Sequence, residues 1–580
     1  MPPTTVFLNS SLSARAHRVL PRHSLRIPVS DGVEISAEIV RPDSQDRFPV
    51  LLGFHPYPNE EQFTEARPVA FCNEFAHVEA GDSNYFVRRG YVHVVANVRG
   101  TGASGGRFDN LGKRTILDIY ETVEWLARQS WSNGKVGMLG MSYFSIVQQF
   151  TAALAPPSLR AIFAPYGWTD MYRDRYYRGG ILVHGFMRLW VPSLHRVRAA
   201  SAVRDALGNE KYQQLVSEAL GDPEIANVPF LRNTLEEVGT GANCLIADTV
   251  IQPLDNGYYR ERSVDWSTRP SIPAYLGADW GIYGLHLPGV MRAWDNWAGP
   301  RRLTIGPPLY LDRPIYQYQE EALRWFDHWL KGIDTGMLEE SPVNLFIDGT
   351  GSWKTADCWP LPNTRWTPFF LHQDGLLSEH EFWTHDNASE YVDAPEERGG
   401  ASFFTPPVVE TTEICGPIAL NIWGSTTDTE VLWFATLLHV DADGRERVLT
   451  RGWLRGSQRR VDPARSTPWR PYHTHDRREP LEPGEIYEFN IEMRPYAILL
   501  RPGERLGIRL RGCDDEKPGN LLQAIGSGSV VRPHRSTVTV HHDAEHPSHL
   551  LLPITRGNRI GMFMSGGKLL PPDPPPASRH

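Results

Sequence analysis

The sequence predicts an α/β core followed by an all-β carboxyl-terminal part. A continuous apolar run at 49–54 and a second, mostly apolar run at 91–98 suit strands that are buried on both faces of a parallel sheet. Between the second run and a third strand at 136–139, residues 116–128 carry apolar side chains at helical spacing, so strand and helix alternate. Beyond Ser341 the pattern changes to short apolar runs separated by Asp-Gly, Pro-Gly and Ser/Thr-rich turns, which is typical of a β-sandwich or jelly roll.

Composition narrows the class of protein. The chain has 580 residues, which suits about two to four domains. Its 59 Lys and Arg against 68 Asp and Glu give a net charge of -9, which argues against a nucleic-acid partner. No apolar run approaches the ~20 residues that span a bilayer, so we expect no membrane partner. We expect a small-molecule substrate and leave open whether the chain forms a homo-oligomer.

The cysteines and the amino-terminal residues bear on the redox state and the location of the protein. The five cysteines are scattered without Cys-x-x-Cys spacing, so we expect buried free thiols, no metal site, no disulfide framework and no cofactor: Cys72, Cys244, Cys358, Cys415 and Cys513. The first 30 residues lack Asp and Glu and contain several arginines, as transit peptides do, but they contain no secretory hydrophobic region. Because residues 24–29 already have the pattern of a strand, we predict a cytoplasmic protein.

The stretch from Lys135 to Ser145 places a serine between a short apolar strand and an apolar helix. In an α/β-hydrolase the nucleophile lies on such a tight turn, where crowding requires small residues two before it and two or three after it. Gly140 meets the first requirement, and Ser145 meets the second less well than glycine would. The turn raises the Ser142 hydroxyl above the sheet edge and directs the Tyr143 backbone N–H to where an oxyanion would form. A chance turn is the alternative.

Two loops follow the other buried strands. The loop His55-Pro56-Tyr57-Pro58 is a candidate pocket wall, because sites gather at the carboxyl ends of strands in open α/β sheets. The glycine-rich run at 99–106 lacks the P-loop lysine and a helix directly after it. We therefore interpret that run as a tight loop rather than a phosphate site.

Residues 171–265 are predicted to be mainly helical, with aromatic residues clustered near their start. Tyr172, Tyr176, Tyr177, His184, Met187 and Trp190 either form a lid over the sheet edge or belong to the core of a helical subdomain. Strands at 272–277 and 302–305 and a helix at 319–331 return to the α/β pattern. The predicted parts are an α/β core at 1–165 and 266–340, a helical cap at 166–265, and a β-sandwich or jelly roll with a proline-rich tail at 341–580.

Short motifs spread along the chain form one set. They are Pro56-Tyr57, Arg99-Gly100-Thr101-Gly102 with Ser104-Gly105-Gly106, Gly140-Met141-Ser142-Tyr143, Pro156-Pro157, Asp170 with Tyr172-Arg173, Gly179-Gly180-Ile181, and Phe326 to Gly332. With the β-rich end, they resemble the CocE/NonD family of serine hydrolases, which is related to cocaine esterase and X-prolyl dipeptidyl peptidases. The resemblance runs from about Leu25 to Ile554.

The resemblance implies an α/β-hydrolase core, a helical cap inserted after the nucleophile strand, and a jelly roll that helps to wall the acyl pocket. It further implies that Ser142 is the nucleophile and that the Tyr57 hydroxyl and the Tyr143 backbone N–H form the oxyanion hole. Each oxyanion donor is typically worth about 2.7 to 4 kcal/mol of activation barrier.

The other two positions of the family's catalytic triad differ in this chain. The family acid follows a strand in a pattern close to Trp-x-Asp, but alignment on Trp280 places Ile282 at the acid position. The family histidine lies in a pattern close to Gly-Pro-x-x-His, where this chain has Tyr310. No histidine occurs between His286 and His328, and we interpret His328 as a structural residue of its helix motif.

Three explanations remain open. A substitute dyad could operate, with Asp279 as the acid and His286, His55 or His184 as the base. The scaffold could instead run a lyase, cyclase or isomerase reaction with the oxyanion hole and the pocket tyrosines, or it could be a non-catalytic ligand-binding protein. We place first a hydrolase that cleaves acyl esters or amides through Ser142 with a degenerate or relocated triad.

Overall fold

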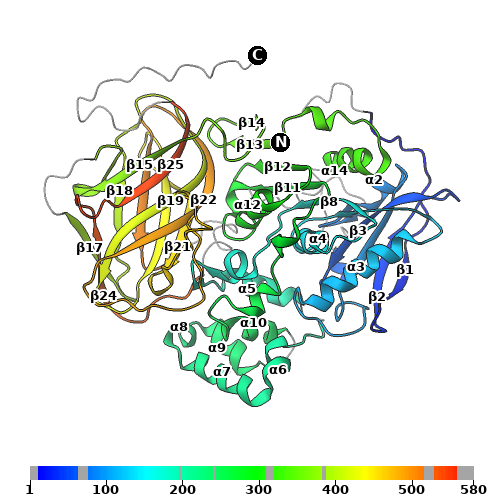
Figure 1. The fold of residues 1–580 in the computed structure, drawn as a ribbon, viewed down its shortest axis with the longest axis horizontal. Coiled ribbons are helices and arrows are strands. Elements are labelled where there is room, and N and C mark those ends of the chain that lie inside the picture. Colours follow the sequence, from blue (N-terminus) through cyan, green and yellow to red (C-terminus); the bar gives the residue numbers. More distant parts are fainter. Residues whose placement is uncertain are drawn as a thin grey trace.

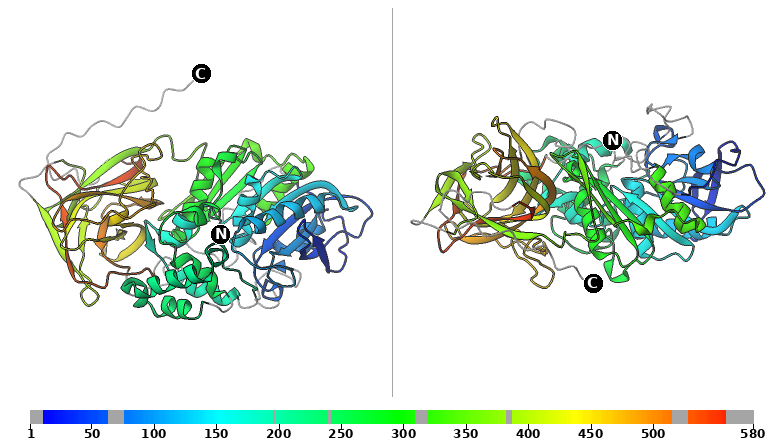
Figure 2. Two further views of the ribbon diagram at one scale, coloured as in Figure 1. Left: turned by 60° about the horizontal axis from the view of Figure 1, so that its bottom comes forward. Right: turned by 90° about the horizontal axis from the view of Figure 1, so that it is seen from above.

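The computed structural model describes residues 11–62, 76–194, 197–238, 242–308, 319–381, 387–514 and 528–557. An α/β part and a β-rich part lie side by side, and a group of helices projects near the junction between them (Figure 1; Figure 2). The amino-terminal strands lie at the edge of the α/β part that is remote from the β-rich part (Figure 1).

The α/β part is built on one sheet with the strand order β1-β2-β6-β3-β7-β8-β11-β12-β13-β14. Its strands are β1 (His23–Pro28), β2 (Glu34–Val40), β3 (Phe48–His55), β6 (Val92–Asn97), β7 (Ser132–Leu139), β8 (Leu159–Pro165), β11 (Ala274–Asp279), β12 (Arg301–Gly306), β13 (Val343–Ile347) and β14 (Ser352–Ala356). Neighbours from β6 to β13 pair in parallel. The two predicted apolar strands are the adjacent β3 and β6, which are buried along their length, so the predicted α/β core is confirmed.

Helices pack closely on this sheet because strand glycines admit them. The helices are α3 (Lys113–Ala127), α4 (Tyr143–Ala153), α12 (Leu287–Asn296) and α14 (Gln319–Phe326), which continues into the π-helical turn η5 (Asp327–Lys331). A Cβ atom on Gly53 would lie 2.9 Å from the Phe144 ring, and one on Gly137 would lie 2.6 Å from the Phe326 ring. Gly332 ends η5 with a φ of 72°, as its predicted role as helix stop requires. Between β3 and β6 lie α1 (Asn59–Gln62), β4 (Ala76–His77), β5 (Gly81–Asp82) and α2 (Ser83–Val87).

The segment inserted after β8 is largely helical, as predicted, but it opens differently. It contains the π-helix η1 (Met171–Tyr176), the strands β9 (Tyr177–Arg178) and β10 (Ile181–Leu182), the helices α5 (Gly185–Trp190), α6 (Ala202–Leu207), α7 (Asn209–Gly221), α8 (Pro223–Ala226), α9 (Pro229–Glu236), α10 (Asn243–Val250) and α11 (Gly257–Arg260), and the 3-10 turns η2 (Val191–Leu194) and η3 (Trp266–Thr268). The prediction of helix is wrong over the β9–β10 hairpin, where Gly179 and Gly180 take φ values of 52° and 83°. A Gly-Gly turn lets two very short strands pair.

The β-rich part is a sheet closed on itself. Its elements are β15 (Arg365–His372), η7 (Gln373–Gly375), β16 (Leu376–Ser378), β17 (Ala388–Asp393), β18 (Ala401–Phe404), β19 (Thr412–Thr426), β20 (Leu432–Val440), β21 (Glu446–Arg455), η8 (Gly456–Gln458), β22 (Tyr487–Leu500), β23 (Arg505–Arg511), β24 (Ser536–His541) and β25 (His549–Arg556). β25 pairs with β15 on one side and with β19 on the other, which completes the ring. The predicted all-β part is therefore a closed β-barrel, and its jelly-roll topology stays a prediction.

The predicted start of the β-rich part at residue 341 needs correction. Strand β13 pairs in parallel with β12, and β14 pairs with β13, so both strands extend the core sheet beyond that position. The 3-10 turn η6 (Met337–Glu339) precedes them. Two short strands with turn residues around them have the same sequence pattern in either sheet, and only their pairing partners assign them to the core.

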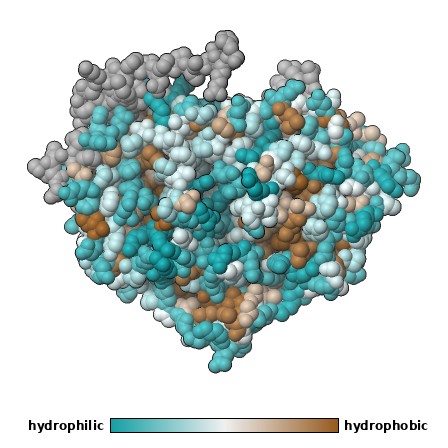
Figure 3. Space-filling model, in the orientation of Figure 1, coloured by the Kyte–Doolittle hydropathy of each residue, from teal (hydrophilic) through white to brown (hydrophobic). Residues whose placement is uncertain are grey.

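The described surface exposes few large apolar side chains. Figure 3 shows hydrophilic side chains over most of one face, with hydrophobic ones in separate groups. The exposed large apolar side chains of the described residues are Leu154, Leu189, Leu207, Leu338 and Val409, which are spread over different elements. In the described part of the chain, every helix falls short of the length and apolar character needed to cross a membrane.

The cysteines of the described residues are free thiols, as predicted. Cys244, Cys415 and Cys513 are buried, and Cys358 is exposed, which corrects its predicted burial. Burial raises the pKa of the Cys244 thiol to about 11, so this thiol is protonated at neutral pH. Cys72 lies outside the described residues.

Candidate active site

The carboxyl ends of four neighbouring parallel strands bring the predicted site residues to one edge of the sheet. Strand β3 leads to Tyr57, β7 to Ser142 and β8 to Tyr166, while β11 ends at Asp279. Loops that follow parallel strands share one edge of a sheet. Residues that are far apart in the sequence therefore lie along one rim.

Ser142 lies on a strained turn between β7 and α4. Its φ of 57° and ψ of -122° are rarely adopted by residues other than glycine. Gly140 takes a φ of 135°, and a Cβ atom there would lie 2.6 Å from the Cβ of Phe144. The Met141 N–H donates to the carbonyl oxygen of Glu79 at 2.9 Å, which fixes the turn from the side. The tight strand–turn–helix geometry that the sequence predicts is present.

The two predicted oxyanion donors come from different loops. Tyr143 directly follows Ser142, and Tyr57 lies in the loop after β3. Ser142 is half-buried, and among the described residues none hydrogen-bonds to its hydroxyl. Tyr143 is the first residue of α4, so its backbone N–H has no acceptor within the helix. The Trp190 indole N–H donates to the Tyr57 hydroxyl oxygen at 3.3 Å, and the Asn97 amide donates to the Tyr57 carbonyl at 2.9 Å.

Asp279 is completely buried, and its carboxylate accepts three hydrogen bonds. The donors are the Tyr166 hydroxyl at 2.9 Å and the backbone N–H groups of Gly281 at 2.8 Å and Ile282 at 2.9 Å. Burial raises the pKa of Asp279 to about 7, although these hydrogen bonds oppose the shift. In the described part of the chain, no histidine hydrogen-bonds to this carboxylate. The structure therefore places the predicted acid on the rim without coupling it to a base.

His286 lies near the same rim, at the start of α12. Its ring meets the ring of Tyr166 edge-on, with centroids 6.1 Å apart, and it hydrogen-bonds the backbone of Gly167. Gly167 abuts α4, because a Cβ atom there would lie 2.6 Å from the Ser145 hydroxyl oxygen. The Nδ1 atom of His286 is buried and has no hydrogen-bond partner among the described residues. Burial and the charge of Arg175 lower the pKa of His286 to about 3, so the ring is neutral at physiological pH.

The other two candidate histidines are also buried, and His55 Nε2 and His184 Nδ1 have no hydrogen-bond partner among the described residues. His55 is fully buried, its ring stacks on Phe144 at 4.9 Å, and its Nδ1 accepts from the Tyr57 N–H at 3.2 Å. Burial lowers the pKa of His55 to about 3 and that of His184 to about 4. Tyr310, which occupies the family histidine position, lies outside the described residues.

A buried cation that the sequence reasoning does not single out lies close to Tyr57 and His286. The Arg175 guanidinium lies over three aromatic rings, at 4.3 Å from Phe186, 4.8 Å from Tyr176 and 5.2 Å from Trp190. Burial lowers the pKa of Arg175, since water no longer stabilises its charge. The available signal in the sequence was the two arginines that flank Asp174, with tyrosines on both sides of them, over 172–177.

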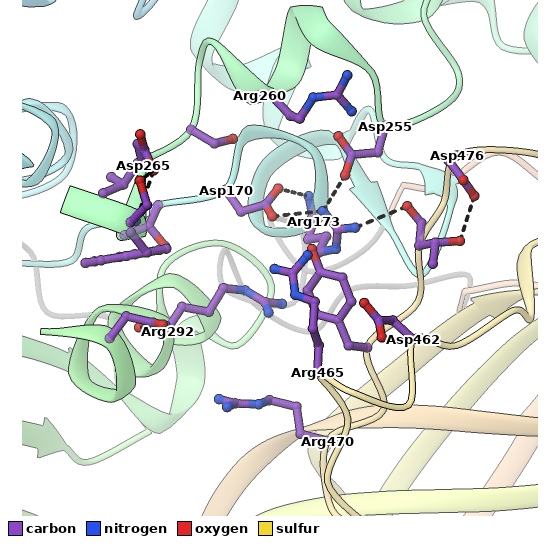
Figure 4. Close-up of a pocket in the computed structure, with 18 residues that line it drawn as sticks. Asp170, Arg173, Asp255, Arg260, Asp265, Arg292, Asp462, Arg465, Arg470 and Asp476 are labelled. Atoms are coloured by element: carbon purple, nitrogen blue, oxygen red, sulfur yellow. Dashed lines mark hydrogen bonds and ion pairs between the residues drawn. The ribbon is translucent and has the colours of Figure 1, made fainter. Parts of the chain in front are cut away.

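A polar cavity lies elsewhere in the molecule. It has a volume of about 850 Å³ and is lined by residues of η1, α12 and the 462–476 loop (Figure 4). Figure 4 shows Arg173 between Asp170 and Asp255, to which it donates at 3.0 and 2.7 Å. Ser142 and Tyr57 do not line this cavity, so it is distinct from the rim described above.

Both parts of the chain match known protein families. Residues 31–308 match the X-Pro dipeptidyl-peptidase (S15) family, and residues 335–551 match the X-Pro dipeptidyl-peptidase C-terminal non-catalytic domain. The chain is 26% identical to a putative serine esterase of Mycobacterium bovis, over 93% of this chain and 96% of the relative. It is 25% identical to a cocaine esterase of a Rhodococcus species, over 92% of this chain and 98% of the relative.

A solved structure supports the similarity found in the sequence comparisons. A CocE/NonD family hydrolase from Staphylococcus aureus superposes with a TM-score of 0.75 at 25% identity, covering 92% of this chain and 93% of that one. The parallel sheet, the strained serine turn and the closed β part thus define a protein with an α/β-hydrolase core and an appended β domain. The chain is thus similar to X-Pro dipeptidyl-peptidases of the S15 family in both parts, and its predicted resemblance to CocE/NonD proteins is confirmed.

Proposed function

We propose that the protein is a hydrolase that cleaves acyl esters or amides through Ser142. The observation that carries the proposal is the strained backbone of Ser142 at the end of β7. Such strain typically costs about 1–3 kcal/mol and persists at functional sites where the surroundings enforce it. The names of the relatives, which are esterases and peptidases, support the same chemistry.

In the proposed mechanism the Ser142 hydroxyl oxygen attacks the acyl carbon. The Tyr57 hydroxyl and the Tyr143 N–H stabilise the oxyanion that forms, as preorganised donors do in acyl transfer. His286 is the proposed base: it takes the Ser142 proton through its open Nδ1 and gives it to the leaving group. Water then releases the acid from the acyl-enzyme by the same path. In this proposal the inserted segment and the closed β part, as a jelly roll, wall the acyl pocket.

The test uses a fluorophosphonate probe and p-nitrophenyl acyl esters. Wild-type protein is expected to be labelled and to release p-nitrophenol, and Ser142→Ala is expected to lose both activities. His286→Gln is expected to be labelled far more slowly than wild type. If neither labelling nor turnover is detected at high enzyme concentration, the proposal is wrong.

A second candidate is a non-hydrolytic reaction on the same scaffold, of the lyase, cyclase or isomerase type. This candidate is favoured by the contacts of Asp279, whose carboxylate accepts hydrogen bonds from Tyr166 and from two backbone N–H groups. None of the described histidines hydrogen-bonds to the Asp279 carboxylate. A substrate that turns over in wild type and in Ser142→Ala, but not in Tyr57→Phe, would support it. Equal loss in both variants would count against it.

A further inference from the structure

Most buried arginines in the described part of this chain lie within ion-pair distance of a carboxylate, whereas Arg175 does not. Each of the following lies within ion-pair distance of an Asp or Glu: Arg99, Arg173, Arg262, Arg324, Arg451, Arg455 and Arg494. Arg178 donates to the carbonyl oxygen of Gly284. Arg175 is only 4% exposed, and within the described residues no carboxylate lies within ion-pair distance of its guanidinium.

The contrast is sharpest within one turn of chain. Arg173 and Arg175 both belong to the π-helix η1, and Arg173 is held by two carboxylates at the polar cavity (Figure 4). Arg175 contacts aromatic rings instead. Ring faces attract a cation, but they supply no anion and accept no bidentate hydrogen bonds. A buried charge without a counter-ion is costly, and a ligand that brings the counter-ion recovers that cost on binding.

The position of Arg175 relates this unmatched charge to the Ser142 site. Trp190, whose ring lies 5.2 Å from the Arg175 guanidinium, donates its indole N–H to the Tyr57 hydroxyl at 3.3 Å. The charge of Arg175 also acts on the His286 ring. Arg175 is therefore separated from the proposed oxyanion tyrosine by one indole ring and lies close enough to the proposed base for its charge to act on it.

We infer that the Ser142 site takes ligands that carry a carboxylate, and that Arg175 binds this carboxylate through paired N–H donors. The planar guanidinium matches a carboxylate in shape and in charge. The inference rests on the proposed function for the identity of the scissile bond, so the substrate class is an acyl ester or amide with a carboxylate in its acyl or leaving group. Anion binding itself does not require turnover.

The activity test compares two esters of similar length, p-nitrophenyl hemisuccinate, which is anionic, and p-nitrophenyl butyrate, which is neutral. The ratio of their kcat/KM values is expected to fall about 10-fold or more in Arg175→Met, because one bidentate charge pair is lost. Arg175→Lys is expected to fall between wild type and Arg175→Met. The matched control is Arg188→Met, since Arg188 is an exposed arginine on α5. An unchanged ratio in Arg175→Met would overturn the inference.

A binding test separates this inference from the proposed function. Thermal unfolding of wild type is measured with phenylacetate, with the neutral phenylacetamide and with inorganic phosphate. Stabilisation by phenylacetate alone is expected, and it is expected to disappear in Arg175→Met. Equal stabilisation by the acid and the amide, or by phosphate, would overturn the inference even if Arg175→Met fails to fold. If Ser142 proves unreactive while phenylacetate still stabilises the protein, only the proposed function fails.

Discussion

Trp190 donates its indole N–H to the hydroxyl oxygen of Tyr57 across 3.3 Å. This contact joins α5 of the inserted segment to the loop after β3, and therefore couples the cap to the predicted oxyanion donor. A hydroxyl that accepts a hydrogen bond is polarised and becomes a better donor through its own proton. The same indole ring faces Arg175, so one side chain supports both groups.

The first prediction concerns this contact. In Trp190→Phe, the kcat/KM for a neutral p-nitrophenyl ester is expected to fall about 2- to 10-fold, because a neutral hydrogen bond is worth about 0.5–1.5 kcal/mol net. Tyr57→Phe removes the oxyanion donor itself and is expected to cost about 100- to 1000-fold. Steady-state kinetics of both variants provide the measurement. A loss in Trp190→Phe as large as that in Tyr57→Phe would show that the indole does more than orient the tyrosine.

The second prediction concerns the turn that carries Ser142. Gly140→Ala places a Cβ atom 2.6 Å from the Phe144 Cβ and 3.0 Å from the Glu79 carbonyl oxygen, at a φ of 135°. The turn is expected to shift, and the rate of fluorophosphonate labelling to fall about 10-fold or more, since about 1.4 kcal/mol of lost alignment has that effect. The measurement is the labelling time course followed by mass spectrometry.

Gly134→Ala is the matched control for this substitution. Gly134 has a φ of 85°, and nothing lies within 4 Å of an added Cβ atom. Only backbone strain of about 1–2 kcal/mol is expected there, with unchanged labelling of the folded protein. Equal labelling rates in the two alanine variants would contradict the crowding argument at Gly140.

The third prediction contrasts two arginines of η1. Arg173→Met leaves Asp170 and Asp255 without their shared cation, so unfolding free energy is expected to fall by about 3–5 kcal/mol. Arg175→Met removes a buried charge that has no carboxylate among the described residues, so stability is expected to stay level or to rise. Urea denaturation of both variants measures the difference. Equal destabilisation would mean that the aromatic rings alone compensate the Arg175 charge.

The sequence predicts those parts of the site that depend on local pattern. The turn at Ser142 and the strands β3 and β6 follow from short runs of glycine and apolar residues, and the structure contains them. Two contacts of the site join segments that are distant in the sequence: Asp279 with Tyr166, and Tyr57 with Trp190. The spacing of residues along the chain therefore could not predict them. The burial of Arg175 is equally a tertiary property, because arginine in a sequence is usually exposed.

The last prediction concerns pH and Asp279. Burial raises the pKa of this carboxyl from 3.8 in a model compound to about 7 in the folded protein. Between these values the folded state holds a proton that the unfolded state has released, so this group's contribution to stability is complete below about pH 4 and is lost as pH rises through about 7. Asp279→Asn stays neutral and keeps an acceptor for the Gly281 and Ile282 N–H groups. At about 1.4 kcal/mol per pKa unit, the variant should gain on the order of 4 kcal/mol relative to wild type between about pH 4 and about pH 8. Chemical denaturation of both proteins across this range measures the gain. Parallel stability curves would show that Asp279 is ionised throughout, and would then favour its service as the acid of a catalytic dyad at neutral pH.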